Sequence, residues 1–294
     1  MSRFLFNLLY GVIRSLPYWL YHALALLGAW VIYSVSARLR RNALESLAIA
    51  FGDTISPRSK DVIARESFLS LTLGIADLAF YIARPGRAAD VFSLEGGAYL
   101  QEARQKGAGA VVAVAHLGPF AAMLFKFLYE GHKVWVVMRP PRSEALRKDL
   151  ISRRDTFAPQ PIYSTPIREC VVACSQVLRR NEVLVMPVDQ NYGGPGRVFV
   201  DFFGRKAATA AGPAAYAAKT GAALLTAFAR PNGRGRWKIT VAPVAIDRTV
   251  PEQEAILKAT QEITARVEAE ARANPGEWSW MHRRWKAVPR EGEV

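Results

Sequence analysis

The sequence has few of the residues that build disulfide-rich or metal-centred proteins. Its 294 residues include two cysteines and four histidines. Cys170 and Cys174 stand four residues apart in a segment with a helical pattern, which suits packed thiols and is too little for a secreted disulfide framework. The histidines are scattered, at His22, His116, His132 and His282. No metal-ligand spacing results, so we expect no metal site.

Acidic residues are scarce as well. The chain carries 25 Asp and Glu against 39 Lys and Arg, a net charge of +14. A surplus of that size favours a polyanionic partner, which is nucleic acid, an anionic membrane face or a phosphorylated substrate. The sequence has no zinc-finger spacing and no RNP-type motif, so we do not expect nucleic acid. The glycine-rich stretch at 193–196 lacks the Gly-Lys-Ser/Thr ending of a Walker-type phosphate loop.

One long apolar run stands near the N-terminus. Between residues 16 and 33 the only clearly polar side chains are tyrosine hydroxyls and His22, and arginines flank the run on both sides. Eighteen such residues approach the length that spans a bilayer. We therefore predict that residues 1–36 form a helix anchored in or lying on a membrane, followed by an α/β domain over 37–294. The alternative is a hydrophobic helix packed inside the protein.

The rest of the chain alternates short apolar runs with helical patterns. Buried strands are predicted at 111–115, 133–138 and 182–188, and an alanine-rich helix is predicted over 207–220. Strands that alternate with helices indicate an α/β fold with a mixed, mainly parallel sheet flanked by helices.

Polar side chains follow three of these strands. His116 ends the first, Arg139 the second, and Asp189 with Gln190 the third. Ligands of open α/β sheets bind at the carboxyl ends of the strands, and a histidine there can transfer protons near neutral pH. A buried imidazole bonded to a backbone carbonyl is the ordinary alternative for a lone histidine. The basic segment after Arg139 is either a phosphate site or a solvated face, and it carries Arg147, Arg153 and Arg154.

In this order the motifs resemble the late acyltransferase family of lipid A biosynthesis in Gram-negative bacteria, within the wider group of glycerolipid and lysophospholipid acyltransferases. The matching segments are Ala115-His116-Leu117-Gly118, Arg139-Pro140, Asp189-Gln190, Phe202-Phe203-Gly204 with Thr209, and Trp278-Ser279-Trp280-Met281-His282-Arg283-Arg284-Trp285-Lys286.

The resemblance implies an enzyme that moves a fatty acyl chain from an acyl carrier protein or coenzyme A thioester to a hydroxyl of a lipid A precursor or related lipid. It implies no cofactor, and a place on the cytoplasmic face of the bacterial inner membrane. His116 would act as general base, which contributes roughly 10²–10⁴-fold. The substrate-binding residues would be Gly118, Arg139, Arg147, Arg153, Arg154, Gln190 and Thr209. A backbone amide near Gly118 or the Arg139 guanidinium would stabilise the oxyanion.

The chain departs from the family pattern at one sensitive position. The family's histidine is followed after four residues by an acid, and here the matching residue is Ala121. Asp189 is the best-placed substitute because it also ends a strand. Alternatively, the enzyme works slowly on His116 alone, or the protein is a non-catalytic lipid-binding relative. The acceptor is open too, since a lysophospholipid or an aminolipid would also suit an acyltransferase that lacks this acid.

Overall fold

A computed structural model describes residues 15–84, 86–141, 158–233 and 235–289. Its main sheet has seven strands: β1 (Phe92–Glu95), β2 (Ala110–Val114), β3 (Val134–Met138), β4 (Gln160–Tyr163), β5 (Val183–Pro187), β8 (Ala223–Pro231) and β9 (Trp237–Pro243). Their order across the sheet is β1-β9-β8-β2-β5-β3-β4, and every pair is parallel except β8 with β9. The predicted mixed, mainly parallel sheet is confirmed.

Strand β2 lies in the middle of this sheet and is buried on both faces. Val111 and Ala113 pack into one hydrophobic cluster, and Val112 and Val114 pack into the other. The first cluster is covered by α9 (Ile167–Arg179), α10 (Gly212–Thr220) and α11 (Glu252–Ala273), and the second by α5 (Arg87–Val91), α6 (Gly97–Lys106) and α7 (Leu124–Tyr129). Helices on both faces explain why the strand is a continuous apolar run without polar alternation.

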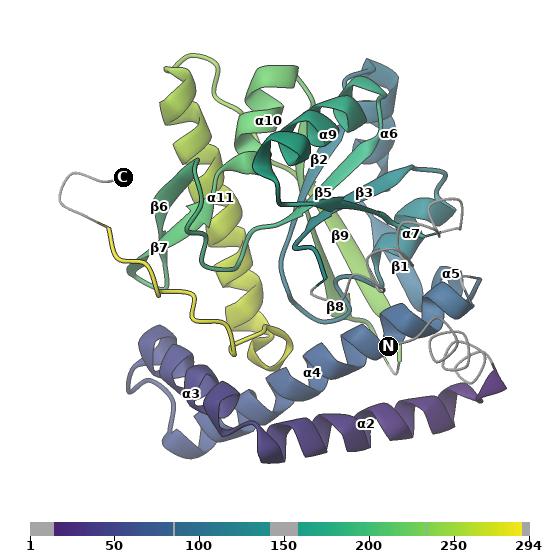
Figure 1. The fold of residues 1–294 in the computed structure, drawn as a ribbon, viewed down its shortest axis with the longest axis vertical. Helices are drawn as coiled ribbons and strands as arrows, with labels where there is room; N and C mark the ends of the chain where they lie inside the picture. Colours follow the sequence, from purple (N-terminus) through teal and green to yellow (C-terminus); the bar gives the residue numbers. More distant parts are fainter. Residues whose placement is uncertain (1–14, 85, 142–157, 234, 290–294) are drawn as a thin grey trace.

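Three helices precede the sheet: α2 (Tyr18–Val35), α3 (Ala37–Phe51) and α4 (Pro57–Ala83). Helix α4 begins at a Ser56 cap, whose hydroxyl accepts a hydrogen bond from the Ser59 amide at 3.0 Å. Helix α2 lies along α4 at the lower edge of the molecule (Figure 1). Hydrogen bonds tie both its ends to α4, because Tyr21 donates to the Ala76 carbonyl at 2.6 Å and Tyr33 to Asp61 at 2.9 Å.

A small hairpin stands apart from the main sheet and corrects one prediction. Strands β6 (Arg197–Phe202) and β7 (Arg205–Ala210) pair antiparallel, so the helix predicted over 207–220 begins only at Gly212. Phe203 and Gly204 connect the strands with positive φ angles of 53° and 70°, the conformation that a two-residue type I′ turn requires. Alanine favours helix in isolation, but strand pairing and burial override that preference here. Strand β4 was not predicted either.

Candidate functional site

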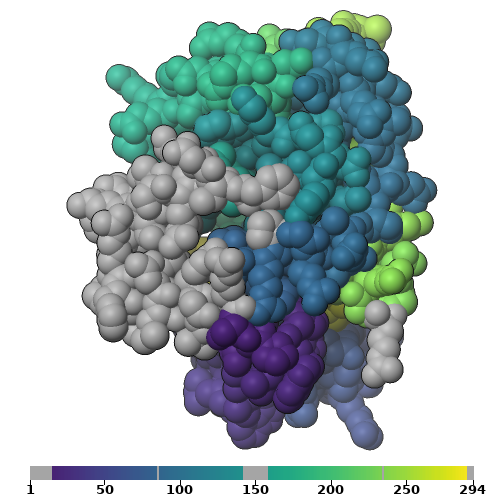
Figure 2. All heavy atoms as spheres, turned by 90° about the vertical axis from the view of Figure 1, so that its right-hand side faces the viewer, coloured from purple at the N-terminus to yellow at the C-terminus, as the bar shows by residue number. Residues whose placement is uncertain are grey.

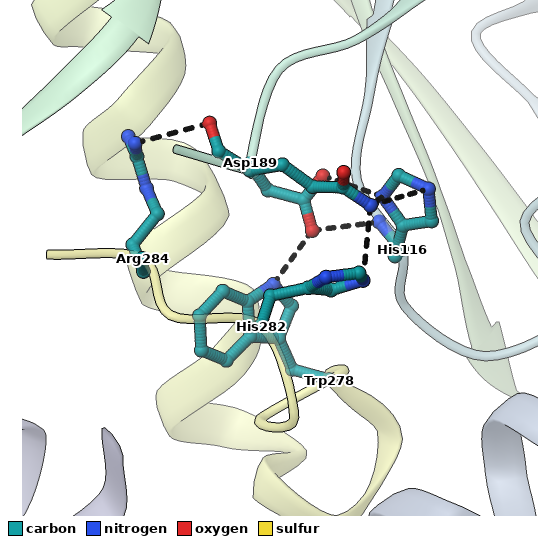
Figure 3. A network of polar contacts seen from close by, with 6 residues as sticks. His116, Asp189, Trp278, His282 and Arg284 are labelled. Atoms are coloured by element: carbon teal, nitrogen blue, oxygen red, sulfur yellow. Dashed lines mark hydrogen bonds and ion pairs between the residues drawn. The ribbon is translucent and has the colours of Figure 1, made fainter. Parts of the chain in front are cut away.

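The carboxyl ends of β2 and β5 bring together the two residues on which the site depends. The parallel register pairs Val114 with Pro187, and His116 and Asp189 each follow two residues later. The two side chains therefore leave neighbouring strands at the same level. Asp189 lies next to the imidazole of His116 (Figure 3). Asp189 is buried, and His116 remains partly exposed.

The two residues share two hydrogen bonds. His116 Nδ1 lies 2.8 Å from Asp189 Oδ1, and the His116 backbone amide donates to Asp189 Oδ2 at 2.9 Å. Asp189, the expected substitute acid, thus lies within hydrogen-bond distance of His116. An ionised carboxylate can only accept, so in the neutral imidazole Nδ1 carries the proton and Nε2 presents a lone pair. This is the tautomer that a general base needs.

Asp189 is almost completely buried, yet it stays ionised. Burial by itself raises the pKa of the carboxyl. Attraction to His116 and the hydrogen bonds from its ring and backbone outweigh that effect and hold the pKa of Asp189 at about 2. The Trp278 indole Nε1 also donates to Oδ2, at 2.9 Å. The buried charge is therefore satisfied from several sides.

A C-terminal segment over residues 277–285 completes the site, and the sequence reasoning assigned none of its residues a role. Trp278 contacts the acid, and His282 lies beside the His116 ring at 5.5 Å between centroids. Arg284 lies on the other side of Asp189 from His116 (Figure 3). The segment docks on the turn after β2, because the Ser279 amide donates to the His116 carbonyl at 3.1 Å. The signal was the dense Trp, His and Arg content of this stretch.

Arg284 holds the loop that carries Gln190. Its guanidinium is 1% exposed and donates to the carbonyls of Gln190 at 3.2 Å and Ala208 at 2.6 Å, and to the Thr209 hydroxyl. Burial lowers the pKa of Arg284 to about 10, so the side chain remains cationic at neutral pH. Its hydrogen bonds link β7 to the loop that follows β5.

Two of the predicted substrate-binding residues make structural contacts within the protein. Thr209 is fully buried, and its hydroxyl donates to the Ala207 carbonyl at 3.0 Å while it accepts from Arg284. The Gly118 amide donates to the Glu277 carbonyl at 3.0 Å, so it is not free to stabilise an oxyanion. Gly118 has a φ of +55°, and a Cβ there would approach the Trp237 ring to 3.0 Å.

Other predicted residues stand differently. Gln190 lies against His116, with its amide nitrogen 3.1 Å from Nε2. Arg139 is exposed at the end of β3. The pKa of His282 is lowered by burial and by the charges of His116 and Arg139, while Asp189 raises it. Arg147, Arg153 and Arg154 fall outside the described residues. Among the described residues, no group of three or more His, Cys, Asp or Glu side chains is arranged to hold a metal ion.

The arrangement is suited to removing a proton from a hydroxyl. A buried carboxylate fixes the imidazole from the Nδ1 side, and the partly exposed ring presents Nε2. Phe120 packs against the same ring at 4.5 Å between centroids. The sequence has Ala121 where the family pattern has an acid, and the carboxylate that contacts the imidazole is that of Asp189.

Comparisons with known proteins agree with this chemistry. Residues 1–287 match the family model described as bacterial lipid A biosynthesis acyltransferase. Two similar proteins are phosphatidylinositol mannoside acyltransferases from two strains of Mycobacterium tuberculosis, 32% identical over 192 and 191 residues. Each match covers 64% of this chain and 58% of the relative's own length.

Proposed function

The chain belongs to the bacterial lipid A biosynthesis acyltransferase family, and from that premise we propose that it transfers a fatty acyl chain from an acyl thioester to a hydroxyl group of a lipid. The observation that carries the proposal is the hydrogen bond of 2.8 Å between His116 and a buried, ionised Asp189. Asp189 thus supplies the acidic partner of the histidine that is missing at Ala121. It favours an enzyme over a non-catalytic lipid-binding relative.

The proposed step uses His116 as general base. Nε2 takes the proton of the acceptor hydroxyl while the hydroxyl oxygen attacks the thioester carbonyl. The new C–O bond gives a tetrahedral oxyanion, which collapses as the C–S bond breaks. The imidazolium returns its proton to the departing thiolate, so the base is regenerated. Asp189 stabilises the imidazolium while it exists. Arg139 is exposed at the end of β3, the strand next to β5, and we assign it to the oxyanion or to a phosphate group of the substrate.

For the acceptor we propose an anionic glycolipid. The mycobacterial relatives are named for phosphatidylinositol mannoside, and the family is described by lipid A biosynthesis. Both names fit a protein of net charge +14 whose Arg139 is near enough to His282 to lower the pKa of that histidine. The donor is an acyl carrier protein or a coenzyme A thioester, and both are anionic. A lysophospholipid or an aminolipid acceptor is the alternative.

We further propose that the protein works at the cytoplasmic face of the bacterial inner membrane. By length and composition, α2 and α4 are apolar enough to cross a membrane. Helix α2 buries only Ala29 and exposes large apolar side chains, with Trp19 at 70% and Trp30 at 68%. Its ends are tied to α4 through Tyr21 and Tyr33. A helix fixed along the protein in this way fits an interfacial position better than a span.

The test is a transfer assay with the full-length protein in mixed micelles. Radiolabelled palmitoyl-coenzyme A and palmitoyl-acyl carrier protein are offered separately with a lipid A precursor, a phosphatidylinositol mannoside and a lysophospholipid. We expect transfer to at least one glycolipid, abolished in His116→Ala while thioester binding persists, because the base acts in the transition state. A folded wild-type protein that acylates none of these lipids would overturn the proposal.

A further inference from the structure

The Gln190 amide stands in an unusual place relative to the candidate base. Its nitrogen is 3.1 Å from His116 Nε2 and 3.4 Å from Nδ1. An atom on the in-plane lone pair of Nε2 would lie roughly 5 Å from Nδ1, because the two ring nitrogens point away from each other. The amide nitrogen therefore lies over the face of the imidazole. The Gln190 amide therefore does not occupy the in-plane lone pair, where an acceptor hydroxyl must bind.

His282 explains why the amide stays there. Gln190 Nε2 lies 2.9 Å from His282 Nε2, a normal hydrogen-bond distance. The amide nitrogen lies over the face of the His116 ring, so its N–H bonds are not used by the in-plane lone pair of Nε2 and can be donated to another acceptor. The NH2 group donates to His282 Nε2 in the tautomer of His282 that carries its proton on Nδ1. The bond to His282 holds the amide away from the plane of the base.

We propose that His282 is a positioning residue that keeps the Gln190 amide off the lone pair of His116. Without this acceptor, the amide is free to swing into the ring plane and donate an N–H to Nε2, where it competes with the acceptor hydroxyl. The inference rests on the proposed function, because it assigns a role within the same site. It concerns a residue that touches Gln190 and that no step of the proposed reaction uses.

The hydrogen bond from Gln190 to His282 depends on the protonation of His282. A protonated Nε2 becomes a donor and can no longer accept from Gln190, so the amide is released. The charged or titratable groups that face His282 in the described structure are His116, Asp189 and Arg139, and its neighbours in the chain are Arg283 and Arg284. Burial, His116 and Arg139 lower the pKa of His282, while Asp189 opposes them. The hydrogen bond from Gln190 to His282 therefore persists at neutral pH.

The test compares four full-length proteins: wild type, His282→Ala, His282→Gln and the double variant His282→Ala/Gln190→Ala. We expect His282→Ala to lower kcat/KM for the acceptor about tenfold, the equivalent of one hydrogen bond, with thioester binding unchanged. His282→Gln offers an amide oxygen to Gln190 and should restore most of the loss. The double variant should be more active than His282→Ala, because no amide remains to block the base.

Two further readouts separate this role from a structural one. The acid limb of log kcat/KM against pH should steepen toward a slope of two in the wild type and keep a slope of one in His282→Gln, which has lost one titrating group. The 15N resonance of His116 Nε2 should move toward its hydrogen-bonded value in His282→Ala with no substrate present. His132→Gln is the matched control, since that buried histidine lies just before β3, at the opposite edge of the sheet.

The outcomes are distinct from failure of the proposed function. A double variant no more active than His282→Ala, or an unchanged Nε2 resonance in His282→Ala, overturns the positioning role even if the enzyme is active. A wild type that transfers no acyl chain overturns the proposed function, and the resonance of Nε2 still decides the role of His282.

Discussion

Asp189 holds the imidazole of His116 through both of its oxygens, since one accepts from the ring and the other from the backbone amide of the same residue, at 2.8 and 2.9 Å. Asparagine has a single acceptor oxygen, so Asp189→Asn must lose one bond and releases the ring to the wrong tautomer. In hydrolase triads the equivalent change lowers kcat about 10⁴-fold. We expect a loss of about 10³–10⁴-fold in acyl transfer, with unchanged thioester binding, measured by initial rates and equilibrium binding. A loss below about tenfold would contradict the catalytic pair.

The same carboxylate should make folding stability depend on pH in the acid range. Its folded pKa of about 2 is below the unfolded value of about 3.9, so its contribution is present above about pH 4 and is lost as the pH falls toward 2. The full effect is about 2–3 kcal/mol, and about half of it is lost by about pH 3. Denaturant unfolding at about pH 6 and about pH 3 should show a larger loss for wild type than for Asp189→Asn. Equal losses would mean that the carboxylate is not held ionised by His116.

The pairing of His116 with Asp189 was predictable because each follows a buried strand, and parallel neighbours end at the same edge of the sheet. The contacts of Gln190 and His282 were not predictable in the same way. His282 lies in a segment without regular structure, and no periodicity in the sequence says where such a segment docks. The buried surroundings of Thr209 were not predictable either, since a hydroxyl in a motif can face the protein interior as easily as a ligand.

At the scale of elements, the C-terminal segment 277–285 is held by bonds that alternate between two other parts of the chain. The Gly118 amide donates to the Glu277 carbonyl at 3.0 Å, and the Ser67 hydroxyl of α4 donates to the Trp278 carbonyl at 2.7 Å. The segment thereby joins α4 to the turn that carries His116. Strand alternation predicted the main sheet, but these non-local contacts of an irregular segment left no comparable pattern.

Trp278 gives this element a direct test. Trp278→Phe removes the indole donor to Asp189 and leaves a small cavity, so we expect about 1–3 kcal/mol lower stability and at least tenfold lower kcat. Trp280→Phe is the matched control, because Trp280 is equally buried and its indole donates to the Pro275 carbonyl at 2.7 Å, away from the catalytic pair. Thermal melts should show both variants destabilised, and only Trp278→Phe should lose turnover per folded molecule. Equal losses of turnover would reduce Trp278 to a packing role.

At the scale of the whole molecule, the apolar N-terminal run and the surplus of basic residues both favour contact with an anionic membrane surface. The predicted division at residue 36 remains a prediction. The structure shows that α2 docks along α4, so deletion of α2 would uncover α4 and confuse anchoring with folding. Figure 2 shows α2 at the lower surface of the molecule, below α4. Point substitutions on the outer face of α2 therefore test membrane contact better than truncation.

Trp19 and Trp30 are eleven residues apart, which places them on one side of α2, and both are about two-thirds exposed. We expect the double variant Trp19→Glu/Trp30→Glu to lower binding to phosphatidylglycerol vesicles at least tenfold in co-sedimentation, because it removes two interfacial aromatics and adds two charges that the anionic surface repels. Val171→Glu/Val172→Glu is the control, since it adds the same charges to exposed positions of α9, at the opposite end of the molecule in Figure 1. Vesicle binding that falls equally in both variants would show that net charge alone, and not the α2 face, holds the protein on the membrane.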